Sequence, residues 1–118
     1  MIGRVISFAD SRPMFKQIDT AELSRMQETG PVVLVDVRTD AEVARGYIAG
    51  AQHIPLHLLP GRSGELKPGV PTVVYCQSGG RSAQACAWLA EQGFTDVANL
   101  QGGIGAWQRE GRPVVVPG

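Results

Sequence analysis

The sequence predicts an α/β fold with one parallel sheet that is covered by helices on both faces. Two short apolar runs, at residues 32–35 and 72–75, are rich in β-branched side chains, which is typical of strands buried on both faces. Helical patterns at residues 19–30, 82–92 and 104–109 alternate with such runs along the chain. This alternation favours parallel strands joined by helical crossovers.

The chain has 118 residues, which suits one domain, and its 43% apolar and 19% charged residues are those of an ordinary globular protein. Eleven basic and eleven acidic side chains cancel, so neither nucleic acid nor a membrane is expected as a partner. No apolar run approaches the roughly 20 residues of a membrane span, and residues 1–10 lack the apolar core of a signal peptide. Two cysteines provide no disulfide framework. We therefore expect a cytoplasmic protein.

The first elements are a short strand at residues 5–8 and a helix whose start is marked by side-chain spacing. Asp19 and Glu22 have the spacing of a capping box, with Asp19 as the N-cap. Gly30 and the proline after it are expected to end this helix. The strand at residues 32–35 then follows.

The middle of the chain predicts three short elements. Asp40 is expected to cap a helix at residues 41–45. A short strand at residues 51–54 comes next, followed by a helical turn at residues 56–59. The turn is expected to end at the break formed by Pro60 and Gly61.

The last third of the chain predicts two strands and two helices. The strand at residues 72–75 leads to a helix from Ser82 to about residue 92, in which small apolar side chains form the packing face: Ala83, Cys86, Ala87 and Ala90. A strand within residues 94–100 precedes the helix at residues 104–109, whose Trp107 is expected in the core. Residues 114–116 are apolar and are expected to lie against the domain or a neighbouring subunit.

The central feature is Cys76, which ends a strand just before a helix begins. A helix N-terminus and a nearby cation such as Arg81 lower the pKa of a thiol from about 8.5 to as little as roughly 3.5. Gly79 and Gly80 allow successive backbone amides to face one point. This combination predicts a nucleophilic thiolate within an anion-binding loop, whereas a lone cysteine is more often a buried structural residue.

The loop also resembles a known family. Its motif, Cys76-Gln77-Ser78-Gly79-Gly80-Arg81-Ser82, is similar to the active loop of rhodanese-type sulfurtransferases. Upstream segments resemble the first signature of that family: residues 34–38, Glu42, residues 46–48, 50–51 and 54–55. Downstream positions resemble its last signature: Val97, Leu100, Gly102, Gly103, Ala106 and Trp107. The matched segments extend from about Ile18 to Pro113.

The resemblance implies a rhodanese fold, with a five-stranded, mainly parallel sheet. Residues 1–15 would be an N-terminal extension and residues 16–118 the single rhodanese domain. It also implies double-displacement sulfur transfer through a persulfide on Cys76. The donor would be thiosulfate or a persulfide, and the acceptor would be cyanide, a small thiol or a dithiol. No cofactor or metal is expected, and the oligomeric state stays open.

The resemblance assigns roles to the residues around the nucleophile. The amides of the loop would bind the anionic sulfur, and Arg81 would orient the oxyanion end of the donor; the substrate-binding set is Gln77, Ser78, Gly79, Gly80, Arg81 and Ser82. Three charged residues would support the loop without taking part in the chemistry: Asp36, Arg38 and Glu42. For Glu42, a solvated surface charge is an equally good interpretation.

The sequence departs from the family at two positions. Tyr47 stands where histidine is usual, so this position cannot titrate near neutral pH. Gln77 stands where the family often has a basic residue, which lowers the local positive charge and weakens the case for a strong preference for thiosulfate.

Two other functions use similar features. Cysteine phosphatases and arsenate reductases also have a Cys-loop-Arg anion site, but their loop is one residue longer than the four residues between Cys76 and Arg81 here. A shorter loop favours a single sulfur atom over a tetrahedral oxyanion. A rhodanese-like module that only binds a partner would be expected to lack the nucleophile, which is present.

The remaining metal-binding and redox candidates are weak. His53 and His57 have the spacing of two ligands on one helix, but Pro55 lies between them and no third ligand is suitably spaced. Cys86 is expected in the core, although a resolving partner for Cys76 is the alternative.

Overall fold

The computed structural model describes residues 15–118, and its centre is one five-stranded sheet in the order β1-β5-β4-β2-β3. Every pair of neighbouring strands is parallel. The strands are β1 (Lys16–Ile18), β2 (Val33–Asp36), β3 (Gln52–His53), β4 (Thr72–Tyr75) and β5 (Val97–Leu100). The predicted α/β class with a parallel sheet is confirmed, and the strand expected at residues 5–8 lies outside the described residues.

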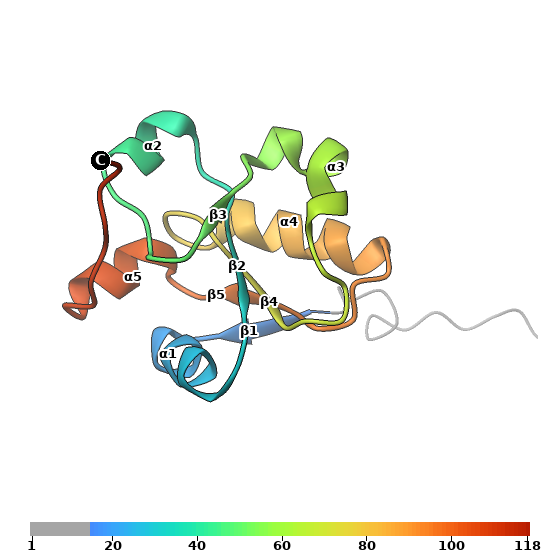
Figure 1. Ribbon diagram of the computed structural model, residues 1–118, viewed down its shortest axis with the longest axis horizontal. Coiled ribbons are helices and arrows are strands. Elements are labelled where there is room, and N and C mark those ends of the chain that lie inside the picture. The colour runs from blue at the N-terminus through green and yellow to red at the C-terminus, as the bar shows by residue number, and fades with distance from the viewer. Residues whose placement is uncertain (1–14) are drawn as a thin grey trace, which may run out of the picture.

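Helices cover both faces of the sheet, as the sequence predicts. They are α1 (Thr20–Thr29), α2 (Asp40–Ala44), α3 (Leu59–Arg62), α4 (Gly80–Glu91) and α5 (Gly103–Arg109), with short 3₁₀ turns η1 (Leu56–Leu58) and η2 (Ser63–Glu65) around α3. Figure 1 shows α1 and α5 on one face and α3 and α4 on the other, with α2 beyond the end of β2. None of the helices within residues 15–118 is long and apolar enough to cross a membrane.

The strand pleat divides the interior into two cores. Successive side chains of a strand point to opposite faces. Val74 therefore packs in the cluster that contains Leu89 of α4, whereas Val73 packs in the cluster that contains Leu23 of α1 and Ile104 of α5. Both faces of the central strand are thus buried, which explains its continuous apolar run.

Two expected helix boundaries are wrong. The cap of α2 is Thr39 and not Asp40: its hydroxyl accepts the Glu42 N–H, and the Glu42 carboxylate accepts the Thr39 N–H, which completes a capping box. Pro60 does not break the chain after residue 59, because it lies in the first turn of α3, where a missing N–H costs nothing.

The buried face of α4 is also displaced from the predicted one. The buried side chains are Ser82, Ala85, Cys86 and Leu89, while Ala83, Ala87 and Ala90 are only partly covered. The helix begins at Gly80, two residues before the predicted start, and it presents Ser82 to the active loop. The periodicity was right and its phase was wrong, because alanines on several faces leave the phase undetermined.

The C-terminal segment lies against the domain. Val115 forms an antiparallel bridge with Tyr47, with two N–H···O bonds of 2.8 Å. The indole Nε1–H of Trp107 donates to the carbonyl of Pro113 (2.7 Å), which fixes the turn after α5. Tyr47 therefore helps to anchor this segment through its backbone.

Candidate active site

The loop from Cys76 to Gly79 joins β4 to α4 at the carboxyl edge of the parallel sheet. Open α/β sheets bind their ligands at this edge. Figure 1 shows the loop between α2 and α5, at the end of α4. The loop predicted from the sequence thus lies at the edge where sheets of this kind bind their ligands.

The sulfur of Cys76 receives converging hydrogen bonds. The amides of Gly79 (3.1 Å) and Ser82 (3.4 Å) and the hydroxyl of Ser82 (3.3 Å) all donate to Sγ. Burial by itself would raise the pKa of this thiol, whose residue is only 1% exposed. The hydrogen bonds from Ser82, Gly79 and the Ser78 amide outweigh burial, so the pKa of Cys76 lies below its usual value. These hydrogen bonds favour the thiolate form of Cys76.

Gly79 gives the loop its curvature. Its φ of +116° lies in the region that L side chains rarely adopt. Its carbonyl accepts a hydrogen bond from Nδ2 of Asn99 on β5 (3.2 Å), and the Asn99 side chain also donates to Gln17 of β1 (3.0 Å). A buried amide on the neighbouring strand therefore helps to fix the Gly79 peptide.

The first turn of α5 holds the other side of the loop. The amides of Ile104 and Gly105 donate to the carbonyls of Cys76 and Gln77, each at 3.0 Å. These contacts turn the loop carbonyls away from the sulfur and leave the amides to face it. Gly103 permits the approach, because its φ is +58° and a Cβ there would collide with the carbonyl oxygens of Cys76 and Gln77, the latter at 2.6 Å.

Gly103→Ala is expected to destabilise the fold by about 2–4 kcal/mol, since it combines a left-handed conformation with a backbone collision. The loop must also move, so we expect sulfur transfer to fall with stability. Chemical denaturation and a turnover assay measure the two effects. Gly69→Ala is the matched control, because no atom lies within 4 Å of a Cβ at that position. Equal stability of the two variants would contradict this role of Gly103.

Ser82→Ala removes the hydroxyl that donates to Cys76 Sγ, so the pKa of the thiol is expected to rise. The rate of thiolate attack falls as the pH drops through that pKa, and the fall should begin at higher pH in the variant. A charged hydrogen bond of about 1.5–3 kcal/mol cuts the thiolate fraction at acid pH at least tenfold. A more basic thiolate is more nucleophilic, which offsets part of this effect. The rate of sulfur uptake should therefore fall about threefold or more at acid pH and should not fall at alkaline pH.

The pH profile of sulfur uptake measures this effect, with Ser24→Ala on α1 as the control. An unchanged profile in Ser82→Ala would show that this hydroxyl does not set the pKa of Cys76.

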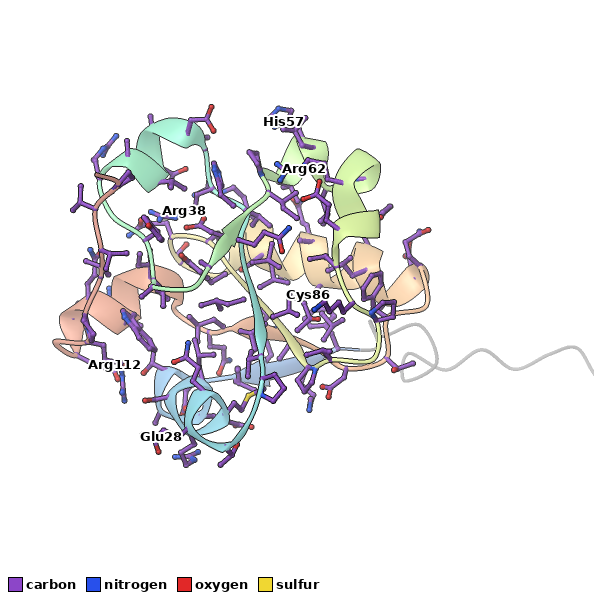
Figure 2. The ribbon with its side chains drawn as sticks, in the orientation of Figure 1. Glu28, Arg38, His57, Arg62, Cys86 and Arg112 are labelled. Carbon is purple, nitrogen blue, oxygen red and sulfur yellow. The ribbon has the colours of Figure 1, made fainter. Side chains whose placement is uncertain are left out.

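Asp36 and Arg38 form a buried ion pair beneath the loop. The Arg38 guanidinium donates to both carboxylate oxygens of Asp36, with Nη2 at 2.8 Å, and Nη2 also donates to the Gly46 carbonyl (2.6 Å). The side chain of Arg38 is 4% exposed and that of Asp36 is 1% exposed. Figure 2 shows Arg38 between α2 and the sheet. The pair links the end of β2 to the turn after α2.

Glu42 and Arg81 form a second pair. Nη1 and Nη2 of Arg81 each donate to one carboxylate oxygen of Glu42, at 2.7 and 2.8 Å. Hydrogen bonds from Arg81 are the main cause that lowers the pKa of Glu42 to about 2, and the pKa of Arg81 is raised in return. The charge of Arg81 is thus compensated. Its expected role in orienting the donor stays a prediction.

Among the described residues, none of the other sequence candidates donates a hydrogen bond to Sγ. His53 bonds through Nε2 to the Arg38 carbonyl (2.7 Å), and His57 lines a cleft that Arg81 also borders. Within residues 15–118, no group of three or more histidine, cysteine or acidic side chains is placed to hold a metal. Cys86 is fully buried, and burial followed by the charge of Cys76 raises its pKa to about 12. Figure 2 shows it on the α4 side of the sheet.

Sequence reasoning missed the residues of β5 and α5 that form hydrogen bonds with the loop. Asn99 and Gly105 contact it from segments at least 20 positions away, and no local pattern signals such contacts. The paired glycines at 102–103 indicate a close backbone approach. The sequence alone did not identify the segment that they approach.

Comparison with known proteins assigns the chain to a family. Residues 19–110 match the model of the Rhodanese-like domain. A protein of Allochromatium vinosum named sulfurtransferase is 50% identical over 105 residues, which cover 88% of this chain and 98% of that protein. The thiosulfate sulfurtransferase GlpE of Stutzerimonas stutzeri is 35% identical over 94 residues, or 80% of this chain and 85% of that protein. A rhodanese-related protein from Thermoplasma volcanium superposes with a TM-score of 0.81 at 31% identity, covering 87% of this chain and all of that one.

Proposed function

Because this chain belongs to the family of rhodanese-like domains, we propose that it is a sulfurtransferase that carries a sulfane sulfur as a persulfide on Cys76. The observation that carries the proposal is the set of donors on Sγ: two backbone amides and the Ser82 hydroxyl within 3.4 Å. These donors stabilise a negative charge on sulfur without any general base.

In the first half-reaction, the Cys76 thiolate attacks the outer sulfur of the donor. With thiosulfate as the donor, the S–S bond of thiosulfate breaks, its electron pair leaves with sulfite, and a persulfide anion remains on Cys76. The converging amides favour this step because the charge stays within the loop throughout.

In the second half-reaction, an acceptor nucleophile attacks the outer sulfur of the persulfide. The new bond forms to the acceptor, and the electron pair of the broken S–S bond returns to Sγ. Cys76 leaves as a stabilised thiolate, so the hydrogen bonds that prepared the nucleophile also make it a good leaving group.

Donors other than thiosulfate fit this site as well. The charge of Arg81 is compensated by Glu42, and Gln77 is neutral, so little free positive charge faces a sulfonate at the loop itself. We therefore include small persulfides among the donors. Two observations argue against a phosphatase. Only four residues lie between Cys76 and Arg81. Arg81 is also paired with Glu42, whereas the arginine of a phosphatase must be free to bind phosphate.

A turnover assay with thiosulfate or an organic persulfide as donor and cyanide as acceptor tests the proposal, alongside an aryl phosphate as substrate. We expect thiocyanate to form and no phosphate to be released. Phosphate release without thiocyanate would favour the phosphatase, and silence in both assays would favour a binding module.

A further inference from the structure

A polar cleft of about 400 Å³ opens beside the active loop. It is lined by Arg38, Glu42, Arg45, Gly46, Gln77 and Gln108. These residues belong to the end of β2, to α2 and the turn after it, to the active loop and to α5, which Figure 1 shows around the loop. Pockets of about 300–1,000 Å³ hold small organic molecules, so this cleft is larger than cyanide or thiosulfate requires.

The charges in the cleft are unequally compensated. Arg38 is paired with Asp36, and Glu42 is paired with Arg81. Arg45 is exposed, and among residues 15–118 no carboxylate lies within 4.0 Å of its guanidinium. The cleft therefore presents one uncompensated guanidinium.

The neighbouring groups extend this positive, hydrogen-bonding surface. A Cβ at Gly105 would lie 3.3 Å from both Arg109 Nη1 and Gln77 Nε2, so these two side chains lie over the same turn of α5. Within the described residues, Arg109 likewise has no carboxylate partner. Gln77 and Gln108 add neutral amides that can donate and accept hydrogen bonds.

We infer that this cleft binds the carboxylate of a low-molecular-weight thiol, which is the sulfur acceptor of the second half-reaction. The inference rests on the proposed function and names the class of acceptor. A guanidinium fork matches a carboxylate in geometry and charge, and the two glutamines suit a polar body. Gln77 directly follows Cys76 in the active loop, so the cleft adjoins the loop that would carry the persulfide.

The transfer step balances without a further reagent. The acceptor thiol RSH gives its proton to the outer sulfur of the Cys76 persulfide anion, the resulting thiolate RS⁻ attacks that sulfur, and a bond forms between the two sulfurs. The Sγ–S bond breaks and its electron pair stays on Sγ, which gives RSSH and the Cys76 thiolate. The proton remains on the transferred sulfur.

The test uses protein loaded with sulfur in advance, so that donor binding plays no part. Loaded wild-type protein and loaded Arg45→Gln are mixed with 3-mercaptopropionate or with 2-mercaptoethanol, and intact mass follows the loss of the persulfide. The two thiols differ in carrying a carboxylate or a hydroxyl. For each protein, the rate with 3-mercaptopropionate is divided by the rate with 2-mercaptoethanol. Comparing this ratio between wild type and variant cancels the difference in intrinsic reactivity between the two thiols.

We expect Arg45→Gln to lower the ratio of the rate with 3-mercaptopropionate to the rate with 2-mercaptoethanol about fivefold. Arg45→Glu should lower it further, because it reverses the charge. Arg25→Gln, which removes an exposed arginine from α1, a helix that contributes no residue to the cleft, should leave the ratio unchanged. An unchanged ratio in both Arg45 variants would overturn the inference alone, whereas failure of the wild-type protein to form any persulfide would overturn the proposed function as well.

Discussion

Cys76→Ser is expected to abolish sulfur transfer, with a loss on the order of 10³-fold or more. The serine hydroxyl fits the space of the thiol, so the fold should persist. Two amides and the Ser82 hydroxyl stabilise an anion at this position, but they remove no proton, and among residues 15–118 no hydrogen bond links a basic side chain to Sγ. A serine there stays protonated and cannot attack the donor. Steady-state thiocyanate formation measures the loss.

Cys86→Ala is the matched control for the other cysteine. Cys86 is fully buried, and its pKa of about 12 keeps it a thiol at neutral pH. We expect this variant to lose stability but to retain sulfur transfer, because the side chain only fills the core. Retained sulfur transfer in Cys76→Ser, or loss of transfer in a folded Cys86→Ala protein, would show that our account places the transferred sulfur on the wrong residue.

Arg38→Met is expected to lower the free energy of unfolding by about 3–5 kcal/mol. The substitution preserves side-chain volume but leaves the Asp36 carboxylate buried without its cation. It also removes the donor to the Gly46 carbonyl, which is only 2.6 Å away. A typical domain is stable by only about 5–15 kcal/mol, so a substantial fraction of the molecules should unfold under mild denaturant. Chemical denaturation gives the value.

Arg62→Met provides the comparison, since it breaks an ion pair of similar length at the surface. Arg62 and Glu65 are held at 2.9 Å, but both side chains are at least one third exposed. We expect a much smaller loss of stability from this change, because water screens an exposed ion pair. A cost for Arg38→Met as small as that for Arg62→Met would mean that the buried pair does not support the loop.

The local features of the fold were predictable from the sequence. The apolar runs of β2 and β4 identify buried strands, and Asp19, whose carboxylate accepts the Glu22 N–H at 2.8 Å, marks the start of α1. The boundary of α2 was misplaced because Thr39 and Asp40 are both good caps, and only the reciprocal contact with Glu42 decides between them.

The active loop was predictable in composition but not in its supports. Cys76, its glycines and the helix start are contiguous, so local physics predicts a thiolate site. The Glu42–Arg81 pair joins residues 39 positions apart, and Asn99 reaches Gly79 from another strand. Arg45 gave no signal in the sequence, because its importance depends on which neighbouring charges are already paired. Such contacts follow from the tertiary fold and from no local pattern.

The most direct test is the intact mass of the protein after incubation with thiosulfate or a small organic persulfide, with the adduct located by peptide mapping. We predict a gain of one sulfur atom, about 32 Da, on the peptide that contains Cys76, with removal by cyanide and no gain in Cys76→Ser. If neither donor leaves an adduct, or if the adduct lies on Cys86 and persists in Cys76→Ser, the persulfide account is contradicted.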